Sequence, residues 1–195
     1  MILSNAEIHK AIDEGRLVIE PEPLPRRPTI GQICPYNTHT VDLKLYSQIF
    51  VPEGGKFDIN LNNPGSITEV IEQHSKKLTL SKEQPFHLDK GDFILARTVE
   101  RIFLPIQKGD INLAARIEGK SSRSRFGLII HCTAPTIHPG FDGTLALEIA
   151  NLGPATFILN PEMYIAQLII EEVRGEIITN PSEFQGQTTP SGLKA

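Results

Sequence analysis

The sequence predicts a mainly β protein, a distorted β-barrel or jelly-roll-like sandwich with short helices near the N-terminus and in mid-chain. Two observations support this class. Apolar and polar residues alternate with a period of two along most apolar runs, as expected for strands that bury one face. Fifteen glycines and fifteen prolines divide the chain into short segments, which suits short strands joined by tight turns.

Two short helices are predicted from capping signals. Ser4 and Glu7 have the spacing of a capping box, in which each side chain satisfies a free backbone N–H at the start of a helix. This predicts a helix from about Asn5 to Glu14. The same spacing begins at Ser66 and predicts a second helix from about Ile67 to Lys76.

Strands are predicted wherever the alternation holds. The strand candidates are residues 41–45, 86–88, 92–105, 145–149, 157–159 and 165–170. Residues 21–35 carry five prolines and are predicted to be an ordered, extended connector. The polar residues 174–195 form a tail. Composition alone gives equal weight to a frayed end and to an ordered one. We therefore expect one β domain, residues 1–173, followed by this tail.

Composition excludes several classes of protein. A net charge of −4 gives no sign of nucleic-acid binding. Two cysteines are too few for a disulfide framework and favour two buried thiols in a reducing cytosol over a single disulfide bridge. The N-terminus lacks the features of a signal peptide, and no run approaches the ~20 apolar residues of a membrane span. We expect a soluble cytoplasmic protein that binds neither membranes nor nucleic-acid polymers.

The densest polar cluster is GKSSRSRFG, residues 119–127. Guanidinium groups and hydroxyls suit phosphate oxygens, and glycines let a backbone approach a ligand closely. The spacing is not that of a Walker loop, and such a run taken alone is more often a solvated loop. The cluster supplies three cations and three hydroxyls, from Lys120, Arg123, Arg125, Ser121, Ser122 and Ser124.

Two features follow this cluster. HCTAPTIHPGFDG, residues 131–143, has the prolines and glycines of a turn that could frame a ligand or simply join two strands. Glu148 lies on the strand face opposite Leu145 and Leu147. By itself this is the pattern of a solvent-facing glutamate. A catalytic role as general acid and base requires that its face line a cleft.

Other kinds of catalytic site are not supported. Zinc deaminases need H-x-E followed by P-C-x-x-C, and neither pattern is present. Nothing signals a serine or cysteine nucleophile with a neighbouring base. On a strand, His131 and Cys132 would point to opposite faces.

Taken in order, the segments GKSSRSRFGL, TAPTIHPGFDG, LALEIAN, PEMYIAQL and FQGQ resemble the dCTP deaminases of the dCTP deaminase and dUTP diphosphatase superfamily. The opening MILSNAEIHKAIDEGRLVIEP and the segment THTVDLKL also resemble that family, so the match runs nearly end to end. Each motif is weak alone, but the set in this order is specific.

This resemblance implies a dUTP diphosphatase-like β-clip subunit in a homotrimer, with active sites at subunit interfaces. It implies hydrolysis of dCTP to dUTP and ammonia, with Mg²⁺ on the nucleotide phosphates and no zinc. By position, Glu148 would be the acid/base, and Ser121 and Arg125 would share the catalytic site. The expected substrate-binding residues are Lys120, Ser122, Thr133, Ala134 (through its carbonyl), His138, Phe184 and Gln187, the last two from a mobile tail closing over the nucleotide.

Among the departures from the family pattern, two bear on the substrate. His138 stands where the family has an aspartate, and Glu183 stands where a lysine is expected near the phosphates. In dUTP diphosphatases the aspartate at this turn activates water, so His138 makes diphosphatase activity the poorer hypothesis. A dUTP diphosphatase or bifunctional enzyme, and an inactive relative that binds nucleotides, remain the alternatives.

Overall fold

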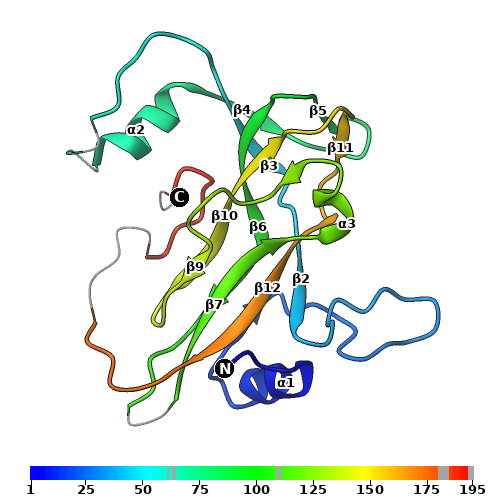
Figure 1. Cartoon of the computed structure of the whole chain (residues 1–195), viewed down its shortest axis with the longest axis vertical. Coiled ribbons are helices and arrows are strands. Elements are labelled where there is room, and N and C mark those ends of the chain that lie inside the picture. Colours follow the sequence, from blue (N-terminus) through cyan, green and yellow to red (C-terminus); the bar gives the residue numbers. More distant parts are fainter. Residues whose placement is uncertain (61, 63–64, 109–110, 180–184, 193–195) are drawn as a thin grey trace.

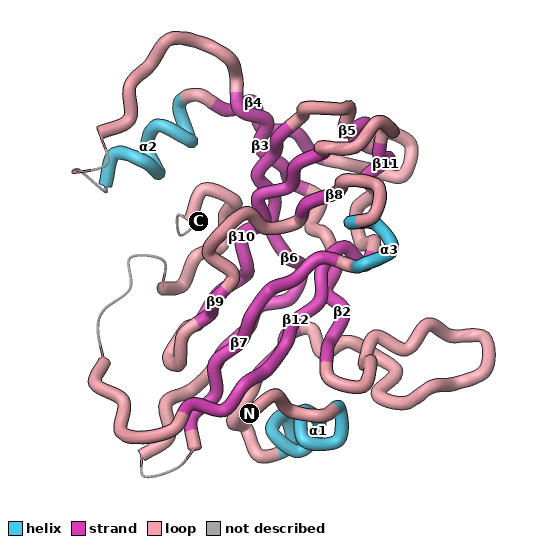
Figure 2. Tube along the Cα trace, in the orientation of Figure 1, coloured by secondary structure: helices cyan, strands magenta, loops and turns pink. Residues whose placement is uncertain are grey.

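The computed structural model describes residues 1–60, 62, 65–108, 111–179 and 185–192, and most of its regular structure is strand (Figures 1 and 2). One sheet has the order β4-β3-β6-β10-β8, with β1 also paired to β6, and a second has the order β2-β12-β7-β9. β5 and β11 form a separate pair. The strands are β1 (Val18–Glu20), β2 (Thr40–Lys44), β3 (Gln48–Pro52), β4 (Ser75–Thr79), β5 (Phe86–Leu88), β6 (Phe93–Phe103), β7 (Asn112–Gly119), β8 (Leu128–Ile129), β9 (Thr136–Ile137), β10 (Asp142–Asn151), β11 (Phe157–Leu159) and β12 (Tyr164–Val173).

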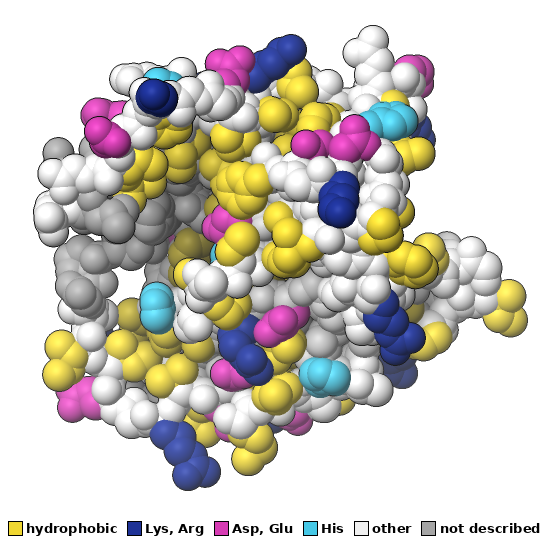
Figure 3. Space-filling view, turned by 45° about the horizontal axis from the view of Figure 1, so that its top comes forward, with side chains coloured by type: hydrophobic (Ala, Val, Ile, Leu, Met, Phe, Trp, Pro, Cys, Tyr) yellow, Lys and Arg dark blue, Asp and Glu magenta, His cyan; other side chains and the backbone are white. Residues whose placement is uncertain are grey.

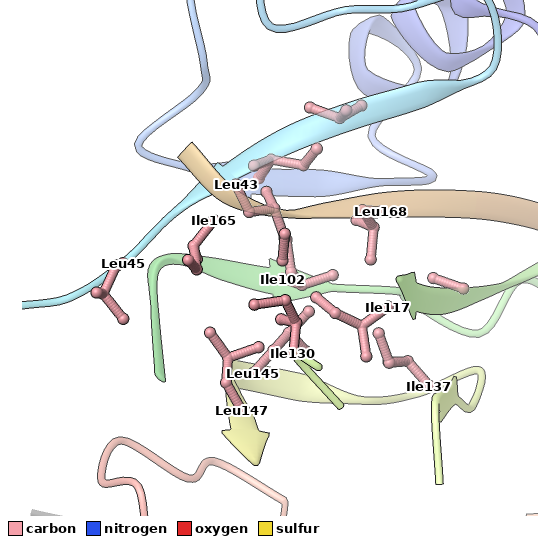
Figure 4. Packing of buried hydrophobic residues seen from close by; sticks show 14 of the residues in the cluster. Leu43, Leu45, Ile102, Ile117, Ile130, Ile137, Leu145, Leu147, Ile165 and Leu168 are labelled. Carbon is pink, nitrogen blue, oxygen red and sulfur yellow. The ribbon is translucent and has the colours of Figure 1, made fainter. Parts of the chain in front are cut away.

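The hydrophobic core lies between the two main sheets. Figure 4 shows Leu145 and Leu147 of β10 and Ile102 of β6 packed near Ile117 of β7 and Leu168 of β12. All five side chains are buried. The mainly β prediction is confirmed. The sheets form an open sandwich rather than a closed barrel, with a jelly-roll-like arrangement of strands.

Both predicted helices are present, but the second is shifted at both ends and begins at Gly65 rather than at Ile67. α1 (Asn5–Asp13) begins where predicted, and the Ser4 hydroxyl accepts a hydrogen bond from the N–H of Glu7. α2 (Gly65–Gln73) ends before the predicted Lys76, because the chain turns into β4 at Ser75. A third helix, α3 (Ser121–Ser124), was not predicted.

The strands that the alternation did not predict have identifiable causes. β3 reads Ile-Phe-Val without alternation, because both Ile49 and Phe50 are buried and so both faces of the strand are covered. β4 is an edge strand with a single large apolar residue, Leu78. In β7 the alanines at 114 and 115 weaken the contrast between its two faces. β8 and β9 have two residues each.

The two cysteines are free thiols. Cys34 is half-buried at the end of the proline-rich connector, where its Sγ donates to the carbonyl of Pro25 at 3.3 Å. Cys132 is exposed, so the prediction of two buried thiols is wrong for it. Arg26 joins the connector to α1 through an ion pair with Asp13, and it forms a second ion pair within the connector with Glu22. In the described part of the chain, no helix is both long and apolar enough to span a membrane.

A buried carboxylic acid joins the two sheets. Glu100 of β6 is 2% exposed, and its Oε2 accepts a hydrogen bond from the N–H of Lys44 at 3.0 Å. That N–H lies beside an irregularity in the pairing of β12 with β2. Burial raises the pKa of Glu100 from 4.5 to about 7, against the opposing effect of the Lys44 hydrogen bond.

This carboxylic acid is expected to make stability depend on pH. The folded state binds the Glu100 proton more tightly than the unfolded chain, so the contribution of Glu100 to the free energy of unfolding is largest below pH 4.5 and falls as the pH rises to about 7. The loss is on the order of 3 kcal/mol. Glu100→Gln should flatten this dependence in urea titrations across that range, whereas the exposed Glu53→Gln should keep it. Equal slopes in both variants would contradict the expectation.

Candidate active site

Glu148 projects from the outer face of β10, away from the core. Its neighbours Leu147 and Ile149 are buried in the core, whereas the Glu148 side chain is 30% exposed. On this outer face, Glu148 lies opposite Leu95 of β6. The alternation along β10 therefore placed Glu148 on the correct face, but the carboxylate is half-buried rather than solvated.

The segment after β8 brings two residues to the Glu148 carboxylate. β8 pairs with β10 through Ile129 opposite Ala150. Continuing that register by two residues places His131 opposite Glu148. His131 Nδ1 forms an ion pair with Glu148 Oε2, and the backbone N–H of Cys132 donates to the same oxygen at 3.3 Å. Residues 131–132 lie outside any strand, so the prediction from strand geometry that their side chains point to opposite faces does not apply here.

The surroundings of His131 favour its protonated form. The Glu148 carboxylate is the main cause of a raised pKa for His131, and burial opposes it. The carbonyl of Ala134 and the charge of Glu118 on β7 also raise this pKa.

Glu148 and His131 line a cavity of 1070 Å³ on the outer face of the β6–β10 sheet. Its volume lies just above the range of about 300–1,000 Å³ that is usual for small-molecule sites. α2, the loop around β9 and the described part of the tail complete its walls, and Figure 3 shows this face hollowed, with hydrophobic side chains along the border. The apolar lining includes Ile67, Ile71, Leu95, Ile106, Ile117, Ile137, Phe141, Leu145 and Ala146.

The described part of the tail packs along the free edge of β10. The N–H of Gly186 donates to the carbonyl of Asp142 at 2.7 Å, and the N–H of Thr144 donates to the carbonyl of Gln187 at 3.1 Å. A Cβ on Gly143 would lie 2.9 Å from the Gln187 carbonyl oxygen, so the close approach needs glycine. Beyond this, Ser191 donates to the Glu72 carboxylate of α2. The tail and α2 thus cover the cavity together.

The tail places one predicted substrate contact differently from expectation. Gln187 lines the cavity but is 7% exposed, and its Nε2 donates to the carbonyl of Thr144 at 2.8 Å. Its amide nitrogen therefore already donates to a backbone carbonyl of β10. Phe184, and the departure at Glu183, lie outside the described residues. That residues 174–195 form a mobile, closing tail stays a prediction.

The polar cluster of residues 119–127 lies away from this cavity. Ser121, Ser122 and Arg125 are exposed on and after α3 and do not line the cavity that holds Glu148. Lys120 forms an ion pair with Asp42, which is 4% exposed. The proposed phosphate-binding groups therefore do not meet Glu148 within one chain.

Of the remaining predicted residues, Ala134 and His138 line the cavity and Thr133 does not. Sequence reasoning missed His131 and the Cys132 amide as contacts of Glu148. The register between β8 and β10 would have identified both, but β8 is too short to be found from the alternation. Among the described residues, no three His, Cys, Asp or Glu side chains are grouped to hold a metal ion.

Comparisons with known proteins agree with the motifs. Residues 2–173 match the family described as dCTP deaminase-like. A protein named dCTP deaminase from Natronomonas pharaonis is 35% identical, over 100% of this chain and 94% of its own length. A Methanosphaera stadtmanae protein named dCTP deaminase, dUMP-forming, is 34% identical, over 99% and 93%.

A solved structure also shares this fold. It is the 2'-deoxycytidine 5'-triphosphate deaminase from Agrobacterium tumefaciens, with a TM-score of 0.61 and 16% identity. The match covers 87% of this chain and 47% of that longer chain. At this identity the structure supports the fold, whereas the full-length relatives and the family match establish the relationship. The chain belongs to the dCTP deaminase-like family.

Proposed function

We propose that this protein hydrolyses dCTP to dUTP and ammonia, with Glu148 as the general acid and base. The observation that carries the proposal is the state of the Glu148 carboxylate. It sits in a largely apolar cavity with Oε2 held by two contacts, while Oε1 accepts no hydrogen bond from the described residues. One oriented carboxylate with a free oxygen is what proton transfer at a bound base requires.

In the proposed reaction Glu148 moves each proton in turn. It takes a proton from water as the hydroxyl adds to C4 of cytosine, and it delivers that proton to N3. It then moves the C4 hydroxyl proton to the amino nitrogen as the C4–N bond breaks. Ammonia leaves, and the uracil ring keeps its N3 proton and C4 carbonyl. General acid and base help of this kind contributes about 10²–10⁴-fold.

No zinc is needed in this scheme, because Glu148 activates the water. Magnesium would travel on the substrate, bound by the phosphates.

The product is the point on which the relatives differ. The Natronomonas relative is named for deamination alone, and the Methanosphaera relative is named dUMP-forming. Release of dUMP would require hydrolysis of the triphosphate as well. His138 at the cavity border has no carboxylate with which to activate water for that step, so we favour dUTP as the product.

A direct assay separates these possibilities. Purified protein with Mg²⁺ and dCTP should release ammonia and dUTP in equal amounts without pyrophosphate. Equal amounts of ammonia and pyrophosphate would instead establish the dUMP-forming reaction. Tight nucleotide binding with no ammonia from cytidine mono-, di- or triphosphates, in deoxy or ribo form, would overturn the proposal and indicate an inactive relative.

We further propose a homotrimer in which α3 of one subunit reaches the Glu148 cavity of the next. This follows from the exposure of Ser121, Ser122 and Arg125 outside their own cavity. Such sharing predicts complementation. Glu148→Gln and Arg125→Ala homotrimers should each be nearly inactive, but subunits mixed by unfolding and refolding together should regain a fraction of wild-type activity. The regained activity would come from sites in which the intact Glu148 of one subunit meets the intact Arg125 of another.

The complementation test has a built-in control. Two variants of the same residue, Glu148→Gln and Glu148→Ala, cannot restore each other whichever way the subunits assemble. Failure of the Glu148 and Arg125 variants to exceed this pair, when mixed trimers are verified by mass spectrometry, would contradict site sharing.

A further inference from the structure

The Glu148 carboxylate has two chemically different oxygens in this structure. Oε2 forms an ion pair with His131 Nδ1 and accepts a hydrogen bond from the backbone N–H of Cys132. Both contacts come from consecutive residues that leave β8 alongside β10. No described residue donates to Oε1. The carboxylate is therefore restrained through one oxygen, and rotation that exchanges its oxygens would break both contacts.

His131 is built into this position rather than resting on the surface. Its side chain is 10% exposed, less than that of Glu148 at 30%. It lines the main cavity and also a second cavity of 400 Å³ towards Gly119 and Ser124. Both ring nitrogens are buried, and neither meets the geometry of a hydrogen bond with a described residue, so Nδ1 contacts Glu148 Oε2 as an ion pair. Such burial of an imidazole is costly unless a partner compensates it, and the compensating partner is Glu148.

We propose that His131 is the positioning residue of this site, holding Glu148 Oε2 so that Oε1 is the oxygen that moves protons to and from the substrate. This role rests on the proposed deamination and gives the two oxygens of the Glu148 carboxylate different functions. His131 itself exchanges no proton with substrate. Its contribution is orientation, and a displacement of about 1 Å in such a group can lower a rate by about 10²-fold.

Two amide variants separate this role from a purely structural one. The amide nitrogen of asparagine lies near the position of histidine Nδ1, whereas that of glutamine lies nearer Nε2. Because the contact with Glu148 is made by Nδ1, His131→Asn should keep the restraint and His131→Gln should lose it. Both variants remove the imidazole and both bury an uncharged amide, so their thermal unfolding midpoints should be similar.

The expected result is a difference in kcat. His131→Gln should lower kcat for dCTP by about 10²-fold, and His131→Asn should stay within about 10-fold of wild type. KM should change little in either, because His131 acts through Glu148. His87→Gln removes an exposed imidazole on β5, outside both cavities, and should leave kcat unchanged.

A titration of the His131 imidazole by NMR gives a readout that does not depend on turnover. The groups facing His131 are Glu148 on β10, Glu118 on β7, the adjacent Cys132 thiol and the Ala134 carbonyl. Since Glu148 contributes most to the raised pKa of His131, Glu148→Gln should lower it. Glu118→Gln should lower it less.

The outcomes distinguish the two proposals. Equal kcat values for both amide variants, or an unchanged His131 titration in Glu148→Gln, would overturn the positioning role while leaving the deaminase proposal intact. Absence of ammonia release by the wild-type protein would overturn both proposals. A shifted titration in that case would show that the contact exists without serving this reaction.

Discussion

Replacing Glu148 with glutamine is expected to lower kcat for dCTP deamination by about 10³-fold or more, because an amide cannot accept and return a proton. Glutamine keeps the size of the side chain, so packing against Leu95 of β6 should persist. The change also leaves His131 without its carboxylate partner. Nucleotide affinity should fall far less than kcat, since the lost interaction is with the reacting atoms.

Steady-state kinetics of ammonia release, together with nucleotide binding by calorimetry, provide the measurement. Glu83→Gln makes the same chemical change at an exposed glutamate between β4 and β5 and should retain full activity. Glu148→Gln with kcat within tenfold of wild type would remove Glu148 from the mechanism.

Gly153→Ala is expected to cost about 3 kcal/mol or more of the free energy of unfolding, the largest stability effect among the glycines whose surroundings are defined. A Cβ on Gly153 would lie 1.6 Å from the carbonyl oxygen of Phe126 and 2.7 Å from its carbonyl carbon. These are backbone atoms, so no side-chain rotation relieves the overlap. On the other side of the contact, Gly127 has φ of +92°, a conformation that favours glycine.

The damage should reach beyond stability. The turn containing Phe126 follows α3 directly and is anchored by the Leu152 N–H, which donates to the Gly127 carbonyl at 2.9 Å. Moving this turn would displace Arg125, which we propose serves a neighbouring subunit. Gly54→Ala is the matched control, because its Cβ would meet no atom within 4 Å, and it should change stability by no more than about 0.5 kcal/mol. Equal urea midpoints for both variants would contradict the prediction.

The sequence could predict features that depend on local spacing. The capping box at Ser4 and the alternation along β10 both depend on neighbours within a few residues, and the structure agrees with them. The alternation alone could not distinguish a catalytic Glu148 from a solvent-facing one, and only the order of several motifs favoured the catalytic role. The comparisons now confirm that family assignment.

Features that depend on distant parts of the chain could not be predicted in this way. The contact of His131 with Glu148 requires the β8–β10 register, and two-residue strands leave almost no periodic signal. The half-buried state of Glu148 depends on α2 and the tail, which cover a sheet face that alternation describes as polar. The raised pKa of Glu100 likewise depends on burial between strands that are distant in the sequence, and it is opposed by a hydrogen bond from Lys44, more than fifty residues away.

The tail along β10 has a consequence for solubility. Gly186 and Gln187 satisfy backbone groups of Asp142 and Thr144 that no strand pairs. An unpaired strand edge is a template on which another chain can add. If nucleotide entry required this part of the tail to leave β10, the backbone groups of a short strand edge would be unpaired until the tail returned. The segment that covers the cavity therefore also covers backbone groups with which another chain could pair.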